Sequence, residues 1–160
     1  MSAGKNKPFV VTTLGALLAI TLFTCNPEQY GASLHSPWIN KLVCHFHHAN
    51  LLHWGCNALA MALMRPSPRE WFCAYPLAVA SMFFTTTQTI GASALIYAYI
   101  GMNIIRWNIS LIDWAFFIVG NIMSAFLPGS AFGVHFAAFI LGIITYKLIG
   151  IKRTDRRRHP

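Results

Sequence analysis

Six apolar runs, separated by short polar breaks, constrain this chain more than any other feature of its sequence. A helix needs about 20 apolar residues to cross the hydrocarbon core of a bilayer, and each run is that long or nearly so. The breaks are rich in residues that favour turns, such as Asn26-Pro27 and Pro128-Gly129-Ser130. The pattern predicts an all-α integral membrane protein with six transmembrane helices in a single domain, residues 1–160. The expected spans are about 8–26, 45–64, 71–87, 91–106, 109–127 and 131–150.

The composition supports a bilayer as the solvent for most of this surface. Hydrophobic residues make up 56% of the chain and charged residues only 10%, whereas a typical globular domain is about 25% charged. A fold with so few charges would leave large apolar patches in water. The net charge is +8, but the basic residues form short clusters between the runs rather than a stripe interleaved with aromatics. This distribution argues against a nucleic-acid partner.

The positive charges predict how the chain is oriented. With the N-terminus inside, eleven of the twelve Lys and Arg residues fall on the cytoplasmic side, and only Lys41 falls outside. Membrane proteins concentrate positive charge on the cytoplasmic side. Merging the fourth and fifth runs into one span would bury Arg106 in hydrocarbon, which is costly. We therefore expect both termini in the cytoplasm and a basic cytoplasmic tail at 151–160. A small chain with a basic tail suits a bacterial inner membrane, and a eukaryotic organelle stays open as the alternative location.

Polar side chains from three of the runs fall at a similar depth. Counted back at ~1.5 Å per residue from the nearest inner charge, Ser93 lies ~20 Å above the cytoplasmic boundary, and His53 and His135 both lie ~18 Å above it. Asn57 lies on the same helix face as His53, one turn deeper. A nucleophilic serine needs a base that takes its proton and donors that hold the oxyanion. One histidine supplies the base, and the other supplies donors together with Asn57.

The four carboxylates of the chain decide between a catalytic triad and a dyad. Glu70 and Asp155 are expected in the cytoplasm, Asp113 enters the fifth run from the inner side, and Glu28 lies in the first loop. None of them reaches the depth of the histidines, so the sequence predicts a Ser–His dyad. Tyr97 follows Ser93 by one helical turn, on the same face, where its ring can support the imidazole.

These residues resemble motifs of the rhomboid intramembrane serine proteases, and the resemblance covers all six runs in order. It implies a rhomboid-like bundle in which Ser93 is the nucleophile and His135 the general base. Two departures stand out, because Ala94 directly follows the serine and Ala138 stands three residues after the base histidine, where the family usually has Gly in both places. The matching residues are His48-Ala-Asn-Leu-Leu-His53-Trp-Gly-Cys-Asn57, Gly91-Ala92-Ser93-Ala94-Leu-Ile-Tyr97-Ala-Tyr-Ile-Gly101, and His135 with Gly142.

The resemblance also implies the supporting residues and the reaction. His53, Asn57 and the backbone amide of Ser93 would form the oxyanion hole, and Gly91 would shape the loop that leads into the serine helix. The substrates would be single-span transmembrane proteins, cleaved near the outer membrane interface without a cofactor or a metal. The partners implied are therefore these substrates and the lipid bilayer.

Two other function classes stay open at this point. A catalytically inactive rhomboid-like protein that binds transmembrane clients would have the same pattern of runs, although Ser93 and His135 are both present. The cluster of His45, His47, His48 and His53 would suit Zn²⁺ or Cu²⁺ in a membrane metal carrier. No carboxylate within the runs and no CxxC pair completes such a site. We instead expect His48 to brace the base of the first loop by hydrogen bonding.

Overall fold

The described part of the chain is built entirely from helices and their connections. The computed structural model describes residues 6–104, 111–126 and 132–149. Over these ranges the α-helices are α1 (Lys7–Phe23), α2 (Trp38–Val43), α3 (Leu51–Met64), α4 (Pro68–Ser81), α5 (Ser93–Ile104), α6 (Leu111–Phe126) and α7 (Phe132–Ile149). Three short 3-10 helices join them: η1 (Pro27–Tyr30), η2 (Cys44–Phe46) and η3 (Met82–Phe84). The helical part of the predicted fold class therefore agrees with the structure.

The prediction of six transmembrane helices is wrong. Among the residues that the structure describes, no helix is both long and apolar enough to cross a bilayer. The run at 45–64 gives only the 14 residues of α3, and the run at 91–106 gives the 12 residues of α5. At 1.5 Å per residue, α5 is ~18 Å long, well short of a hydrocarbon core ~30 Å thick. The predicted six-span bundle with both termini cytoplasmic is therefore corrected to a bundle of shorter helices.

Several sequence predictions fall outside the described residues. These are the basic tail at 151–160, Arg106, Asp155, the break at Pro128-Gly129-Ser130 and the side chain of Asp113.

Local sequence signals explain where α3 and α4 begin and end. Asn50 caps α3, because its side chain accepts a hydrogen bond from the His53 amide at 2.9 Å. The helix ends at Arg65, which has a positive φ of 50° and precedes a proline. Ser67 and Glu70 then form a reciprocal capping box at the start of α4. Asn50, a polar residue inside the run at 45–64, thus begins α3 later than hydropathy alone would place it.

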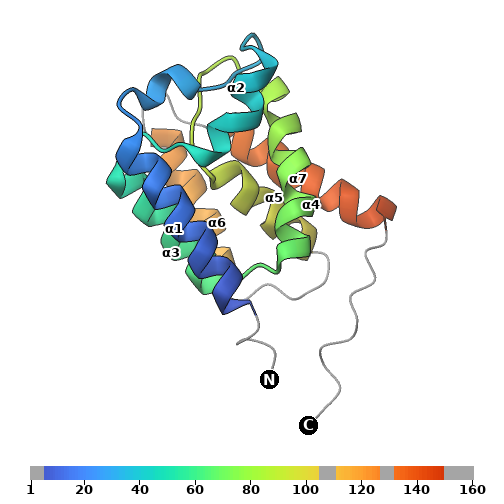
Figure 1. Cartoon of the computed structure of the whole chain (residues 1–160). Coiled ribbons are helices and arrows are strands. Elements are labelled where there is room, and N and C mark those ends of the chain that lie inside the picture. Colours follow the sequence, from blue (N-terminus) through green and yellow to red (C-terminus); the bar gives the residue numbers. More distant parts are fainter. Residues whose placement is uncertain (1–5, 105–110, 127–131, 150–160) are drawn as a thin grey trace.

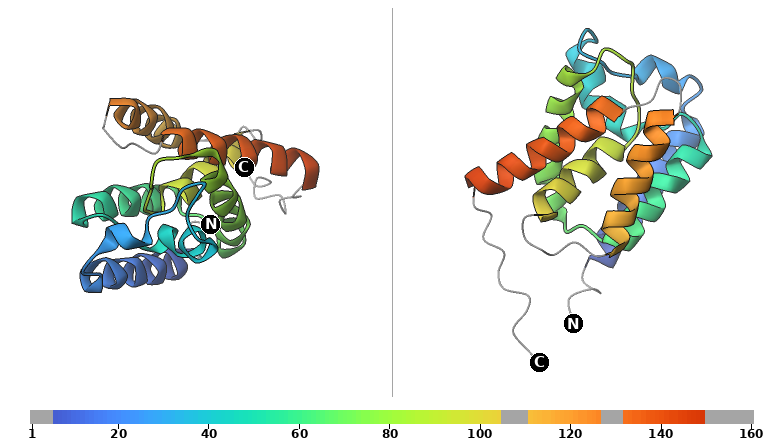
Figure 2. Two further views of the ribbon diagram at one scale, coloured as in Figure 1. Left: turned by 90° about the horizontal axis from the view of Figure 1, so that it is seen from above. Right: turned by 180° about the vertical axis from the view of Figure 1, so that it is seen from behind.

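Helix α5 lies at the centre of the bundle. In Figure 1, α1 and α3 lie side by side on one flank, α4 lies on the other, and α6 lies behind. Nine of the twelve residues of α5 are buried. Helix α7 crosses α5, as the rear view in Figure 2 shows. The buried apolar side chains form a core around this crossing.

Two glycines let α5 and α7 approach unusually closely. A Cβ on Gly101 of α5 would overlap the carbonyl oxygen of Phe139, and a Cβ on Gly142 of α7 would overlap that of Ala98. Any side chain at either position would push the helices apart. This close contact lies two to three turns after the start of each helix, on the C-terminal side of Ser93 in α5 and of His135 in α7.

Backbone hydrogen bonds hold the loop that leads into α5. Ala32 and Thr89 exchange two such bonds, each 2.9 Å long, in an isolated antiparallel bridge. The Gly91 amide donates to the carbonyl of Cys44 at 2.9 Å. The segment before the serine helix is therefore tied at Thr89 and Gly91, which precede Ser93 by four and two residues.

Candidate active site

Ser93 is the first residue of α5 and is only partly buried. The first N–H groups of a helix have no partner within it, and they carry the positive end of the helix dipole. A hydroxyl at this position therefore lies beside amide donors that suit a developing negative charge. Ser93 is thus partly accessible at the first position of a helix that is mostly buried.

His135 forms a hydrogen-bonded pair with Ser93. Its Nε2 lies 2.8 Å from Ser93 Oγ, within the range expected for a nucleophile and its base. The imidazole, in the first turns of α7, is only 6% exposed. Burial lowers the pKa of His135 to about 4, and the neighbouring His53 contributes to the shift in the same direction. The ring is therefore neutral near pH 7 and can accept the serine proton.

The ring of Tyr97 supports the imidazole of His135 by stacking. The two ring centroids are 4.3 Å apart and their planes differ by 7°. The tyrosine hydroxyl is buried and has no hydrogen-bond partner among the described residues. Gly120 of α6 lies against this hydroxyl, since a Cβ there would overlap it. Tyr97 thus contacts His135 through its ring face rather than through its hydroxyl.

His53 and Asn57 converge on Gly91. A Cβ on Gly91 would lie 2.7 Å from His53 Nε2 and 3.4 Å from Asn57 Nδ2, and the φ of Gly91 is +117°, which favours glycine. Within the described parts of the chain, Asn57 Nδ2 is buried without a hydrogen-bond partner. A buried donor left unpaired costs about 1–3 kcal/mol. This amide is therefore an unsatisfied donor that lies beside the serine loop.

The remaining histidines each serve a different contact. His47 stacks on Tyr30 with ring centroids 3.9 Å apart, whereas His45 is fully buried beside Tyr75. His48 Nε2 lies 3.5 Å from the Ala92 amide, which donates to it. In the described ranges, no three His, Cys, Asp or Glu side chains come together where a metal ion would bind. The alternative of a metal carrier therefore has no site in this part of the chain.

The structure brings together every site residue that the sequence proposed, and it adds some that the sequence missed. Thr21 of α1 contacts His48, and the carbonyl of Cys44 holds the Gly91 amide. Neither contact has a signature in the sequence, because both join segments far apart in the chain. Isolated hydroxyls within an apolar run, such as Thr21 and Thr24, are the one available signal.

Comparisons with protein-family models, curated proteins and solved structures found no match for this chain. The resemblance to the rhomboid proteases therefore gains no support from them and rests on the quoted residues alone.

Proposed function

We propose that this protein is a serine endopeptidase in which Ser93 is the nucleophile and His135 the general base. The observation that carries the proposal is the 2.8 Å contact between Ser93 Oγ and His135 Nε2. A lone buried serine more often packs or bonds to its own helix. Here the hydroxyl instead meets a neutral imidazole that is itself held by a stacked ring, which is the arrangement that activates a nucleophile.

Acylation begins when the Ser93 oxygen attacks the carbonyl carbon of the scissile peptide bond and its proton passes to His135 Nε2. The carbonyl oxygen becomes an oxyanion, which Asn57 Nδ2, His53 and the amide of Ser93 stabilise by donating hydrogen bonds. His135 then gives the proton to the leaving amine, and an acyl-Ser93 ester remains. Water attacks this ester with His135 again acting as base, which releases the acid product and restores the serine.

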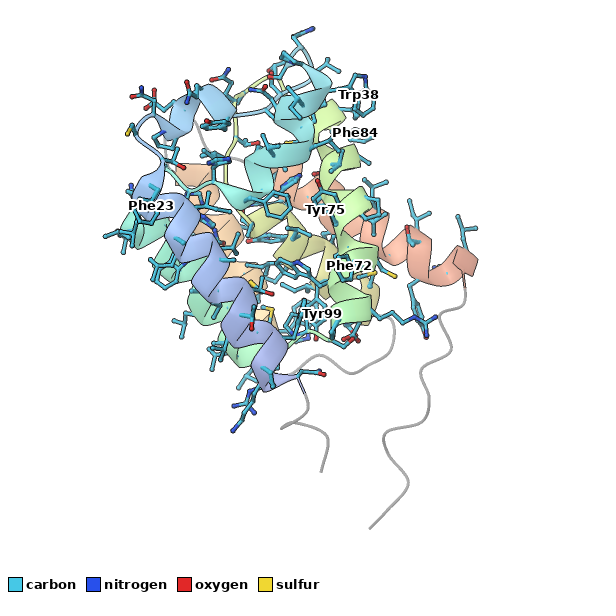
Figure 3. All side chains as sticks on the ribbon, in the orientation of Figure 1. Phe23, Trp38, Phe72, Tyr75, Phe84 and Tyr99 are labelled. Atoms are coloured by element: carbon cyan, nitrogen blue, oxygen red, sulfur yellow. The ribbon has the colours of Figure 1, made fainter. Side chains whose placement is uncertain are left out.

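The proposed substrates are apolar segments, namely single-span transmembrane proteins cleaved near the membrane interface. Large apolar side chains on the helices around the site support this choice, since Leu52 of α3, Leu111 of α6 and Phe136 of α7 are all more than half exposed. Figure 3 shows further aromatic side chains at the surface, among them Phe23, which is 85% exposed, and Phe72, which is 70% exposed. Contact with a lipid surface, and a bacterial inner membrane as the location, belong to the same proposal.

Labelling with a fluorophosphonate probe tests the nucleophile. The purified protein should react covalently, Ser93→Ala should not react, and His135→Ala should react at least about a hundredfold more slowly because the base is lost. Ser81→Ala is the matched control, since this buried hydroxyl donates to the Ala78 carbonyl within its own helix. Undiminished labelling of Ser93→Ala would refute the assignment. A folded protein that binds transmembrane segments but is never labelled would favour the inactive client binder instead.

A second experiment tests the substrate class. A single-span transmembrane protein in lipid vesicles and a polar unstructured peptide are offered to the same enzyme. Cleavage of the first, absent in Ser93→Ala, supports the proposal. Cleavage of the polar peptide alone would leave the dyad in place and overturn the choice of substrate.

A further inference from the structure

A chain of hydrogen bonds connects α1 to the residue before the nucleophile. Thr21 Oγ1 donates to the carbonyl of Leu17 at 2.7 Å, and the same oxygen lies 3.4 Å from His48 Nδ1. On the other side of the ring, the Ala92 amide donates to His48 Nε2 at 3.5 Å. The imidazole is 1% exposed, so water has little access to either contact.

The position of each proton in this chain follows from the chemistry of its members. A hydroxyl has one proton, and that of Thr21 is given to Leu17, so the Thr21 oxygen can only accept from His48. A backbone amide can only donate, so His48 Nε2 must accept from Ala92. Both ends therefore require the same tautomer, with the proton on Nδ1. The opposite tautomer would set donor against donor at Ala92 and acceptor against acceptor at Thr21.

We propose that Thr21 is a positioning residue that fixes His48 in its Nδ1–H tautomer, so that His48 holds the Ala92 amide and thereby the start of the serine helix. The inference rests on the proposed function of Ser93 but depends on a different set of atoms. Thr21 does not touch the reacting groups and acts only through His48. Helix α1, which contributes no residue to the dyad, is in this way connected to the site.

The structure contains a matched control for the relay formed by Thr21, His48 and the Ala92 amide. It lies three residues after Thr21, at the C-cap of α1. Thr24 Oγ1 donates to the carbonyl of Ile20 at 2.6 Å and lies 3.1 Å from His47 Nδ1. The chemistry is the same, but the ring of His47 stacks on Tyr30. Loss of the Thr24 hydroxyl should therefore leave the serine loop undisturbed.

Two variants separate the relay from simple packing. Thr21→Val has nearly the same shape but leaves His48 Nδ1 without its acceptor, whereas Thr21→Ser keeps the hydroxyl. We expect Thr21→Val to slow fluorophosphonate labelling of Ser93 by about three- to tenfold, the effect typical of one lost hydrogen bond. Thr21→Ser and Thr24→Val should stay within about twofold of the parent protein.

The tautomer itself is read by nuclear magnetic resonance of the full chain labelled with ¹⁵N-histidine, where long-range couplings identify the protonated ring nitrogen. His48 should give the Nδ1–H pattern in the parent protein, in Thr21→Ser and in Thr24→Val. In Thr21→Val the pattern should become a mixture of tautomers. The His48→Gln spectrum identifies the signals that belong to this ring.

The outcomes distinguish this inference from the proposed function. An Nε2–H tautomer in the parent protein, or an Nδ1–H pattern that persists in Thr21→Val with an unchanged labelling rate, overturns the relay even if Ser93 is labelled. An Nδ1–H tautomer that depends on Thr21, in a protein whose Ser93 never reacts, supports the relay and refutes the peptidase.

Discussion

His45 makes the stability of this protein sensitive to acid. Its ring is fully buried and lies edge-on to Tyr75, whose hydroxyl donates to the Leu42 carbonyl at 2.7 Å. In the described structure neither ring nitrogen makes a hydrogen bond. Burial lowers the pKa of His45 from 6.5 to about 4, an effect that the nearby Gly91 backbone partly opposes. The folded state therefore takes up this proton much less readily than the unfolded chain does.

The sign and size of the effect follow from proton linkage. Because the pKa of the folded state is the lower one, the stabilisation from neutral His45 is complete above pH 6.5 and is lost as the pH falls towards 4. Each pH unit in that window costs about 1.4 kcal/mol, so a change from pH 8 to pH 5 should cost about 2 kcal/mol through this ring. For a chain of this size, that corresponds to a loss of about 4–8 °C in Tm.

The variant His45→Leu isolates this contribution. The altered packing in this variant changes stability equally at both pH values. The quantity to compare is therefore the difference in Tm between pH 8 and pH 5, and each Tm is measured by circular dichroism. We expect that difference to be about 4–8 °C smaller in His45→Leu than in the parent protein. His35→Leu, which replaces an exposed ring, should not reduce it. An equal acid-induced loss in the parent and in His45→Leu would refute the reasoning.

Four further outcomes concern the site and its framework. Asn57→Ala should slow acylation of Ser93 by about a hundredfold or more while the fold persists, and a smaller effect would exclude this amide from the oxyanion hole. Tyr97→Phe should keep the labelling rate within about twofold, because only the ring face contacts His135. Tyr97→Leu should lower the labelling rate by about tenfold, because the stacked ring is lost. Equal labelling rates in these two variants would contradict the stacking role. Gly142→Ala should destabilise the fold by about 1–3 kcal/mol in thermal unfolding, since its methyl meets backbone, and an unchanged Tm would show that the helices can separate. The labelling rate should persist from pH 8 down to about 5 and should fall as His135 is protonated near its pKa of about 4. A labelling rate that falls with a midpoint near pH 6.5 would contradict the buried state of this ring.

The regular rise of an α-helix allowed the sequence to group Ser93 with two histidines. Counting residues from charged boundaries at a constant ~1.5 Å per residue placed Ser93, His53 and His135 at a similar depth, whereas the choice of His135 as the base was implied only by the rhomboid resemblance. The helix lengths, which were predicted from hydropathy, were wrong because hydropathy does not register where backbone capping begins a helix. Asn50 starts α3 six residues into its run, and the bonds of Gly91 delay α5 until Ser93.

The contacts that hold the site in place could not be predicted, because they join segments with no pattern in common. Thr21 and His48 are 27 residues apart, and Ala32 pairs with Thr89 across 57 residues. A hydroxyl in an apolar run is most often satisfied by its own helix, as Thr21 is by Leu17. Only the fold shows that the same oxygen has a second partner.

The methyl groups of Ala94 and Ala138 raised the question of whether the dyad could close. Both side chains are buried, at 1% and 0% exposure, yet the Ser93–His135 contact is 2.8 Å. The closest backbone approach lies instead at Gly101 and Gly142, where an added Cβ would overlap the opposing helix. Since the two helices cross, a methyl away from the point of closest approach can be accommodated by the angle between them. The closest approach of α5 and α7 therefore lies at these two glycines and not at the residues next to Ser93 and His135.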